Sequence, residues 1–144
     1  MIDDVIASKL DIIETPGGSV LHAMKNSSRG FVGFGEAYFS EIDGGAIKAW
    51  KRHNNMILNI VVPVGKIKFV LFDNRYEPNG VFQEIIISRD NYIRLTVPPM
   101  IWFGFQGLDK HQSTLLNIAN IVHDPNELER IEIDKINYDW SVDR

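Results

Sequence analysis

Short apolar runs separated by turn residues limit this chain to a few fold classes. Eight such runs, rich in Val, Ile, Phe, Tyr and Trp, follow one another between positions 31 and 122, and each is bounded by Gly, Pro, Asn or Asp. We predict strands at residues 31–42, 46–53, 56–63, 66–73, 82–88, 92–97, 101–105 and 114–122. Short strands with a turn signal about every 8–12 residues favour an all-β jelly roll or sandwich over a parallel α/β sheet.

The strand predicted at residues 66–73 shows the alternation of a strand with one buried face. Ile67, Phe69 and Leu71 share one face, whereas Lys68 and Val70 lie on the other. This pattern predicts that the three large side chains point into the core.

One segment near the C-terminus has the start signal of a short helix. Asp124 is a typical N-cap residue, and Pro125 suits the first helical turn. We expect one or two turns there, before the apolar residues 131–133. The 144 residues contain no internal repeat or linker, and their number is typical of one domain. The sequence therefore predicts a single domain over residues 1–144.

The composition argues against several classes of function. A chain without cysteine has no disulfide, no thiolate metal site and no cysteine nucleophile. Its net charge of −4 gives no electrostatic reason to bind nucleic acid. Asp3 and Asp4 stand where a secretory signal carries positive charge, and Asn59 and Pro63 interrupt the longest apolar stretch. We expect a cytoplasmic protein that binds neither nucleic acid nor a membrane.

The four histidines form no recognisable metal motif. His22, His53, His111 and His123 occur in neither a His-x-His pair nor a His-Glu-x-x-His helix. A glycine-rich phosphate loop before a helix and a serine nucleophile elbow are absent as well. We therefore predict neither a metal nor a cofactor.

Residues 48–53 combine cations, a tryptophan and a histidine within one predicted strand. Alternation places Lys51 and His53 on one face, and Lys48 and Trp50 on the other. If the first face lines the inside of the jelly roll, Lys51 needs an anionic partner or ligand, because burying an unpaired ammonium costs several kcal/mol. The alternative is an edge strand whose lysines prevent aggregation.

Asp73 is the candidate partner of Lys51, since it is a second candidate for an inward charge, at the end of the strand predicted at residues 66–73. The alternative is that Asp73 is an ordinary turn acid that pairs locally with Arg75.

Residues 45–51 read GAIKAWK. This stretch has the frame of the motif Gly-Val-x-Arg-Gly-Leu-His of the dTDP-4-dehydrorhamnose 3,5-epimerases, a family that the sequence resembles. Further matching elements follow in the same order: Arg29-Gly30-Phe31 with Glu36, Gly65, Phe72-Asp73-Asn74-Arg75, residues 98–105, Asp124-Pro125, Asp134 and Trp140. The resemblance implies a homodimeric, metal-independent, cupin-type jelly roll. It also implies action on a nucleotide-linked 4-keto-6-deoxysugar, dTDP-linked in the family, in deoxysugar and surface polysaccharide biosynthesis.

The resemblance also implies a set of site residues, several of them substituted. Lys51 occupies the position of the histidine base, and Asn117 that of the tyrosine acid, while Phe103 replaces a substrate-contacting histidine. The implied catalytic group is Lys51, His53 and Asp73, and the implied substrate contacts are Arg29, Glu36, Tyr38, Lys48, Phe103 and Asn117.

These substitutions limit the chemistry. A lysine is a competent base when burial lowers its pKa, but an asparagine has no proton to give to carbon. We therefore expect proton transfer on one face of the sugar, as in a single epimerisation or a tautomerisation, and no double epimerisation. Two other functions stay open: a catalytically inactive module that senses or escorts a nucleotide sugar or supports a partner enzyme, and a cupin for an unrelated carbonyl compound. Trp50, between two cations on an outward face, is expected at an interface.

Overall fold

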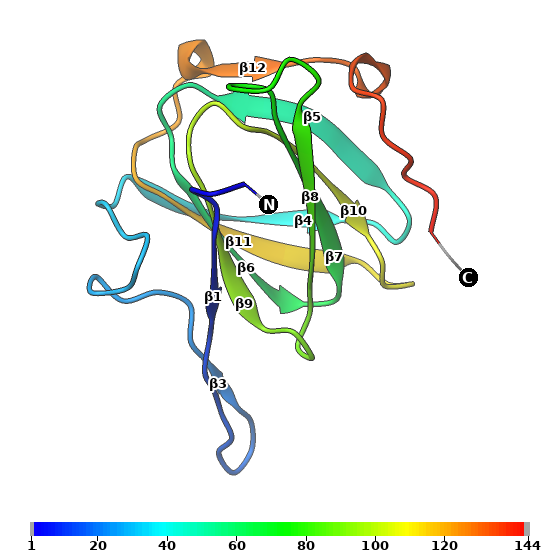
Figure 1. The fold of residues 1–144 in the computed structure, drawn as a ribbon. Helices are drawn as coiled ribbons and strands as arrows, with labels where there is room; N and C mark the ends of the chain where they lie inside the picture. The colour runs from blue at the N-terminus through cyan, green and yellow to red at the C-terminus, as the bar shows by residue number, and fades with distance from the viewer. Residues whose placement is uncertain (1, 143–144) are drawn as a thin grey trace.

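The computed structural model describes residues 2–142, which fold into two five-stranded antiparallel sheets packed face to face (Figure 1). The first sheet has the order β1 (Ile6–Lys9), β9 (Ile93–Val97), β6 (Leu58–Val64), β11 (Ser113–Ala119) and β4 (Glu36–Ile42). The second has the order β12 (Leu128–Arg130), β5 (Ile47–His53), β10 (Trp102–Gly107), β7 (Ile67–Asp73) and β8 (Val81–Ile87). The predicted all-β jelly roll is confirmed.

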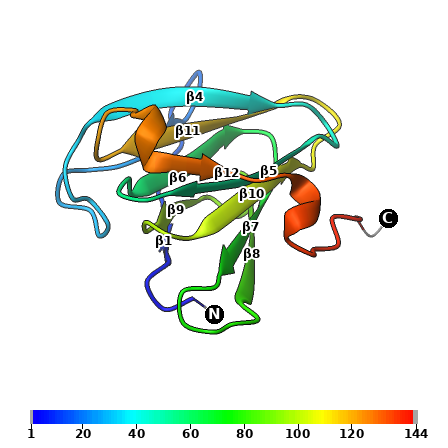
Figure 2. The same cartoon turned by 90° about the horizontal axis from the view of Figure 1, so that it is seen from above.

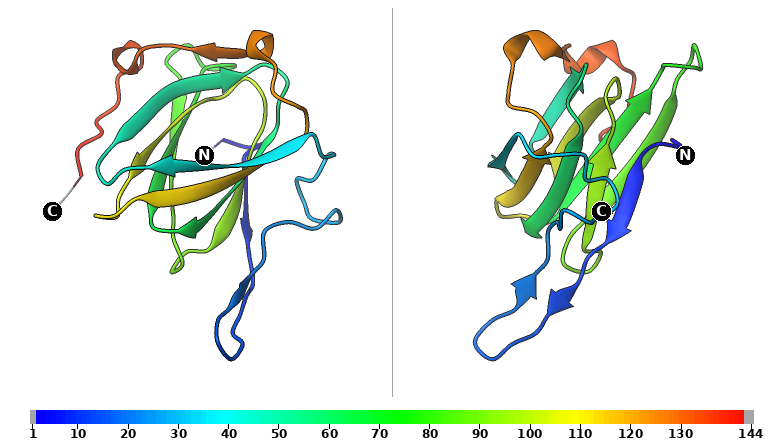
Figure 3. Two further views of the ribbon diagram at one scale, coloured as in Figure 1. Left: turned by 180° about the vertical axis from the view of Figure 1, so that it is seen from behind. Right: turned by 90° about the vertical axis from the view of Figure 1, so that its left-hand side faces the viewer.

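All eight predicted strands form, most of them within two residues of the predicted ends. The largest difference is at β4, which begins at Glu36 instead of residue 31. Gly33 has a φ of +132°, which extended strands do not use, so the chain becomes regular only after it. A short hairpin of β2 (Ile12–Ile13) and β3 (Val20–Leu21) was not predicted, and it projects away from both sheets (Figure 3).

The predicted helix is a single 3₁₀ turn, Pro125–Glu127. The Asp124 carboxylate accepts a hydrogen bond of 2.9 Å from the Asn126 N–H, as its N-cap role requires. The chain then enters β12, which pairs with β5, and a second 3₁₀ turn follows at Ile133–Lys135. Over residues 2–142, no helix has the length and the apolar character needed to cross a membrane.

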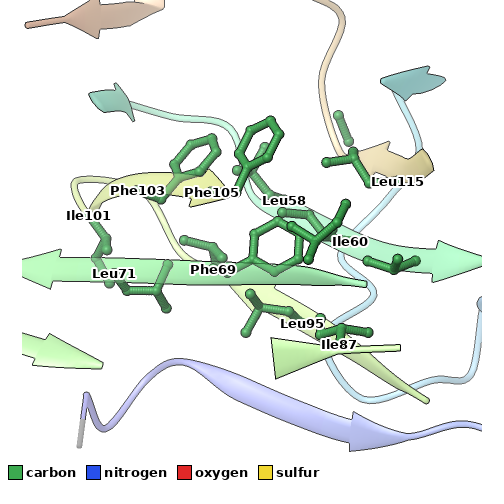
Figure 4. Packing of buried hydrophobic residues seen from close by; sticks show 14 of the residues in the cluster. Leu58, Ile60, Phe69, Leu71, Ile87, Leu95, Ile101, Phe103, Phe105 and Leu115 are labelled. Atoms are coloured by element: carbon green, nitrogen blue, oxygen red, sulfur yellow. The ribbon is translucent and has the colours of Figure 1, made fainter. Parts of the chain in front are cut away.

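The hydrophobic core lies between the sheets and uses the faces that alternation predicted (Figure 4). Phe69 and Leu71 of β7 are fully buried there, opposite residues of the first sheet such as Leu95. Each large apolar side chain buried in this way contributes about 1.5–3 kcal/mol. Part of this core also forms the floor of a cavity.

A second apolar cluster covers the outer face of β5, β10 and β7. The C-terminal segment crosses this face (Figure 2), and its Ile136 and Trp140 pack against Trp50, Val70 and Trp102. The indole N–H of Trp50 donates a hydrogen bond of 3.1 Å to the Ile133 carbonyl. The expectation that Trp50 is exposed at an interface is wrong, because the chain's own C-terminal segment leaves it only 1% exposed.

Candidate active site

A cavity of about 860 Å³ opens between the two sheets. Its floor is apolar and consists of Leu58, Ile60, Phe69, Phe103, Phe105 and Leu115. Four cationic side chains line it as well: Lys48, Lys51, Arg130 and Lys135. Among the described residues that line the cavity, Glu132 is the one acid. A site of this volume, apolar at the bottom and cationic around it, suits a ligand with an uncharged body and anionic groups.

A β-bulge brings two lysines of β5 into this cavity. Lys51 lies opposite Phe103 and Lys48 opposite Phe105, so three steps along β5 match two along β10. The extra residue reverses the alternation, and Lys48 and Lys51 therefore share the inner face. The prediction that Lys48 faces outward is wrong for this reason. Its Nζ donates a 2.8 Å hydrogen bond to the Glu41 carbonyl and lies 6.0 Å from the Phe105 ring centre.

Lys51 is the most desolvated amine of the cavity. Its Nζ lies 5.4 Å from the centre of the Phe103 ring. Burial lowers the pKa of Lys51, and the charges of Arg130 and Lys48 lower it further, while Glu127 acts in the opposite direction. No carboxylate of residues 2–142 lies within ion-pair distance of this Nζ. A larger fraction of Lys51 than of an exposed lysine is therefore in the neutral form, which is the form that can accept a proton.

His53 lies behind the cavity wall in a buried pair with Glu127. Its Nδ1 contacts one carboxylate oxygen of Glu127, and its ring stacks on Phe103 at 6.2 Å between centres. The second oxygen of Glu127 accepts hydrogen bonds from the N–H groups of Asn55 and Met56, at 3.1 and 3.2 Å. Burial lowers the pKa of His53 despite this carboxylate. Burial alone raises the pKa of Glu127, but its three hydrogen bonds outweigh that effect and lower it.

Tyr38 and Asn117 line the cavity from the first sheet. They are partners in the β4–β11 register, and the Asn117 amide donates a hydrogen bond of 3.0 Å to the Tyr38 hydroxyl oxygen. Asn117 is only 2% exposed, whereas Tyr38 is 37% exposed.

Besides His53, three of the sequence-predicted site residues lie outside the cavity: Asp73, Arg29 and Glu36. The carboxylate of Asp73 accepts hydrogen bonds of 2.9 and 3.0 Å from Arg75, which lowers the pKa of Asp73. The predicted pairing of Asp73 with Lys51 is therefore wrong, and the local alternative is confirmed. Arg29 lines a separate groove of about 250 Å³, and Glu36 begins the edge strand β4.

The C-terminal segment supplies residues that the sequence reasoning missed. Glu127, Arg130, Glu132 and Lys135 come from one 3₁₀ turn, the three-residue β12 and the turn after it. No periodic signal marks this strand, because Leu128 is followed by two charged residues and the alternation typical of a strand is absent from β12. In the part of the chain that the structure describes, no group of three His, Cys, Asp or Glu side chains could hold a metal ion.

A comparison with solved structures places this architecture in a family. A dTDP sugar isomerase from Desulfovibrio desulfuricans G20 superimposes with a TM-score of 0.91. The two sequences are 36% identical, and the match covers 96% of this chain and 92% of that one. The chain belongs to the dTDP-sugar isomerases of the dTDP-4-dehydrorhamnose 3,5-epimerase-like cupin family. The resemblance carried by residues 45–51 and the ordered motifs around them is thereby confirmed.

More distant structures share the cupin fold of this dTDP-sugar isomerase family. A sugar 3,4-ketoisomerase from Thermoanaerobacterium thermosaccharolyticum in complex with TDP is 17% identical, with a TM-score of 0.76 over 94% of this chain and 96% of that one. A dTDP-4-dehydrorhamnose 3,5-epimerase from Elizabethkingia anophelis NUHP1 is 13% identical, with a TM-score of 0.78 over 98% and 83% of the two chains. No protein-family model matches the chain, and no curated protein matches it either.

Proposed function

We propose that this family member is a metal-independent isomerase or epimerase of a nucleotide-linked 4-keto-6-deoxysugar, with dTDP as the nucleotide. The reaction would serve deoxysugar and surface polysaccharide biosynthesis. One observation carries the proposal: the desolvated amine of Lys51 lies over the apolar floor of a cavity whose other charged groups are mostly cations. This arrangement in a relative of a dTDP sugar isomerase suits a substrate with a ketone at one end and a diphosphate at the other.

Lys48, Arg130 and Lys135 are the proposed contacts of the diphosphate. Charge-assisted hydrogen bonds to phosphate oxygens are about twice as strong as neutral ones, and an arginine fork binds two oxygens at once. The three side chains line the same cavity as Lys51, so anchoring the diphosphate there holds the sugar over Phe69, Phe103 and Phe105.

Lys51 is the proposed base. Its neutral amine takes the proton from the carbon next to the C4 ketone, the C–H electron pair forms a carbon–carbon double bond, and the ketone oxygen becomes an enolate. The apolar floor excludes water and strengthens the attraction between this oxygen and the remaining cations. Return of a proton to carbon completes the reaction.

His53 acts as a positioning residue in this proposal. Its ring stacks on Phe103, which also lies beside the Lys51 amine, and Glu127 holds the ring from behind. Asp73, Arg29 and Glu36 lie elsewhere in the monomer, so their catalytic and binding roles stay predictions.

We also propose that the chain forms a homodimer through β4. This strand pairs with β11 on one side only and contains neither the lysine nor the proline that commonly guards an open edge. Exposed apolar side chains accompany it, with Phe34, Phe39 and Val122 between 64% and 70% exposed. A two-fold axis would pair this edge with its own copy. The cytoplasmic location and the single domain over residues 1–144 stay predictions.

The test is deuterium uptake from heavy water into dTDP-4-keto-6-deoxyglucose, followed by NMR and mass spectrometry. We expect exchange at a carbon next to the ketone with the wild-type protein, and a loss of at least about 100-fold in Lys51→Met. Lys66→Met is the matched control, because Lys66 is an exposed lysine outside the cavity. Saturable changes in the ligand resonances without exchange would indicate the binding module instead. No exchange and no binding would refute the proposal.

A further inference from the structure

The cavity presents a phenol on the wall opposite Lys51. Tyr38 and Asn117 belong to β4 and β11 of the first sheet, whereas Lys51 belongs to β5 of the second, and the two sheets face each other (Figure 2). All three side chains line one cavity. A sugar ring bound between the sheets therefore has one face toward the Lys51 amine and the other toward the Tyr38 hydroxyl.

Asn117 forms a hydrogen bond that makes the Tyr38 hydroxyl oxygen an acceptor. Its amide N–H donates to the Tyr38 oxygen at 3.0 Å, so that oxygen is the acceptor and the phenol's own O–H proton is left for another partner. A hydrogen bond donated to the oxygen also stabilises the phenolate that remains after proton donation. Because Asn117 is 2% exposed and its strand pairs with β4 along seven residues, this donor is held firmly in place.

We infer that Tyr38 is the proton donor on the face opposite Lys51, that Asn117 positions it, and that the reaction is an inversion at a single carbon. The inference rests on the proposed function, and it replaces the one-face proton transfer expected from the sequence. The family position of the acid is Asn117 in this chain, and the phenol comes instead from its register partner on the neighbouring strand.

The step balances in protons and electrons. After Lys51 has removed the proton from the carbon next to the ketone, the enolate carbon–carbon electron pair takes the O–H proton of Tyr38 from the other side. The ketone re-forms, the new C–H bond lies on the opposite face, and Tyr38 is left as phenolate while Lys51 is ammonium. Tyr38 is 37% exposed and Lys51 is half-buried, so water can return the proton to Tyr38 and accept the one on Lys51.

Two alternative roles of Tyr38 give different results when the hydroxyl is removed. A contact to the nucleotide would change substrate binding and leave the ratio of inversion to exchange unaltered. A hydrogen bond to the enolate oxygen would support proton removal itself, so exchange and inversion would fall together.

The experiment compares Tyr38→Phe with the wild-type protein in heavy water on dTDP-4-keto-6-deoxyglucose, scoring deuterium uptake and configuration separately. We expect Tyr38→Phe to keep exchange with retention within about two-fold, because the Lys51 ammonium exchanges its protons with solvent and returns a deuteron to the same face. Inversion should fall by about 100-fold or more, the usual contribution of a general acid. Tyr76→Phe is the control, since Tyr76 is an 80% exposed loop residue outside the cavity.

Asn117→Ala tests the positioning role, and it should lower the rate of inversion about ten-fold with little change in KM. The inference is overturned if Tyr38→Phe inverts the sugar at the wild-type rate, or if exchange and inversion fall equally. The wild-type protein separates the two proposals. If it shows no exchange at all, the proposed function fails and takes this inference with it, whereas wild-type exchange with unimpaired inversion in Tyr38→Phe refutes the inference alone.

Discussion

Replacing Glu127 with alanine should destabilise the fold more than any other single charge removal near the site. The carboxylate of Glu127 accepts from the His53 ring and from the N–H groups of Asn55 and Met56, and its side chain is only 5% exposed. Asn55 is exposed, so its N–H can turn to water in the variant. The Met56 N–H is buried and cannot turn to water. The neutral ring of His53 carries one N–H in either tautomer, and in the variant this buried N–H has no acceptor among the described residues.

Each buried donor without a partner costs about 1–3 kcal/mol, so two of them cost about 2–6 kcal/mol, and we expect a loss near 4 kcal/mol. Urea unfolding measures this as a lower midpoint at an unchanged slope. Glu129→Ala is the matched control. Glu129 lies two residues along the chain and pairs with Arg52 at the surface with 47% of its side chain exposed, so its removal should cost at most about 1 kcal/mol. Equal losses in the two variants would contradict the account of Glu127 as a buried anchor.

The same pair makes stability depend on pH in a defined direction. The native-state pKa of His53 lies below its ordinary value of 6.5, so the unfolded chain takes up a proton first and stability falls as the pH drops below about 6.5. The pKa of Glu127 is also lowered, from 4.5, so its contribution is complete above that pH and is lost as the pH falls through the native value. The difference between wild type and Glu127→Ala should therefore shrink in acid.

Two further predictions concern the base and the dimer. Lys51→Met should raise the stability at pH 7 in urea unfolding, because the lowered pKa of Lys51 means that the folded state holds the ammonium less favourably than the unfolded chain does. For the same reason, kcat/KM of the wild-type protein for deuterium exchange should rise with pH to a plateau that begins below pH 10.5. A Lys51→Met variant less stable than wild type would contradict this account. Phe39→Glu should convert the proposed dimer to a monomer in analytical ultracentrifugation without a loss of secondary structure, because Phe39 is 70% exposed on the open edge of β4. An unchanged mass would move the interface elsewhere.

Local alternation was sufficient for the eight strands between residues 31 and 122. It offered the inward direction of Lys51 as one of two alternatives, and the lining of the cavity decides between them. Alternation failed at Lys48, since a bulge depends on how β5 is matched to β10, and that matching is not a property of either strand alone. The local alternative was correct for Asp73, because Arg75 lies only two residues away. Its guanidinium reaches the Asp73 carboxylate without a contact between distant segments.

Contacts between distant segments explain most of what the sequence reasoning missed. Glu127 meets His53 across 74 positions, and Trp50 meets the Ile133 carbonyl across 83. Contacts of this kind leave no periodic pattern in the sequence, because each joins a short C-terminal segment to a strand far away along the chain. The pairing of Asn117 with Tyr38 could not be predicted from the sequence either. Only the pairing of β4 with β11 shows that the Tyr38 phenol lies beside Asn117, the position that the resemblance assigns to the acid.

Lys51 stands where the resemblance implies a histidine, and its surroundings include the buried pair of His53 and Glu127. His53 lies two residues further along β5, on the face to which alternation returns the side chain, and it forms a buried pair with Glu127. There it is buried, and it supports Phe103 instead of facing the cavity. The position in front of it is thus free for a longer side chain, whose amine can pass over the Phe103 ring and reach the ligand space. Lys51 and His53 thus contact the same Phe103 ring, the lysine through its amine and the histidine through its stacked imidazole.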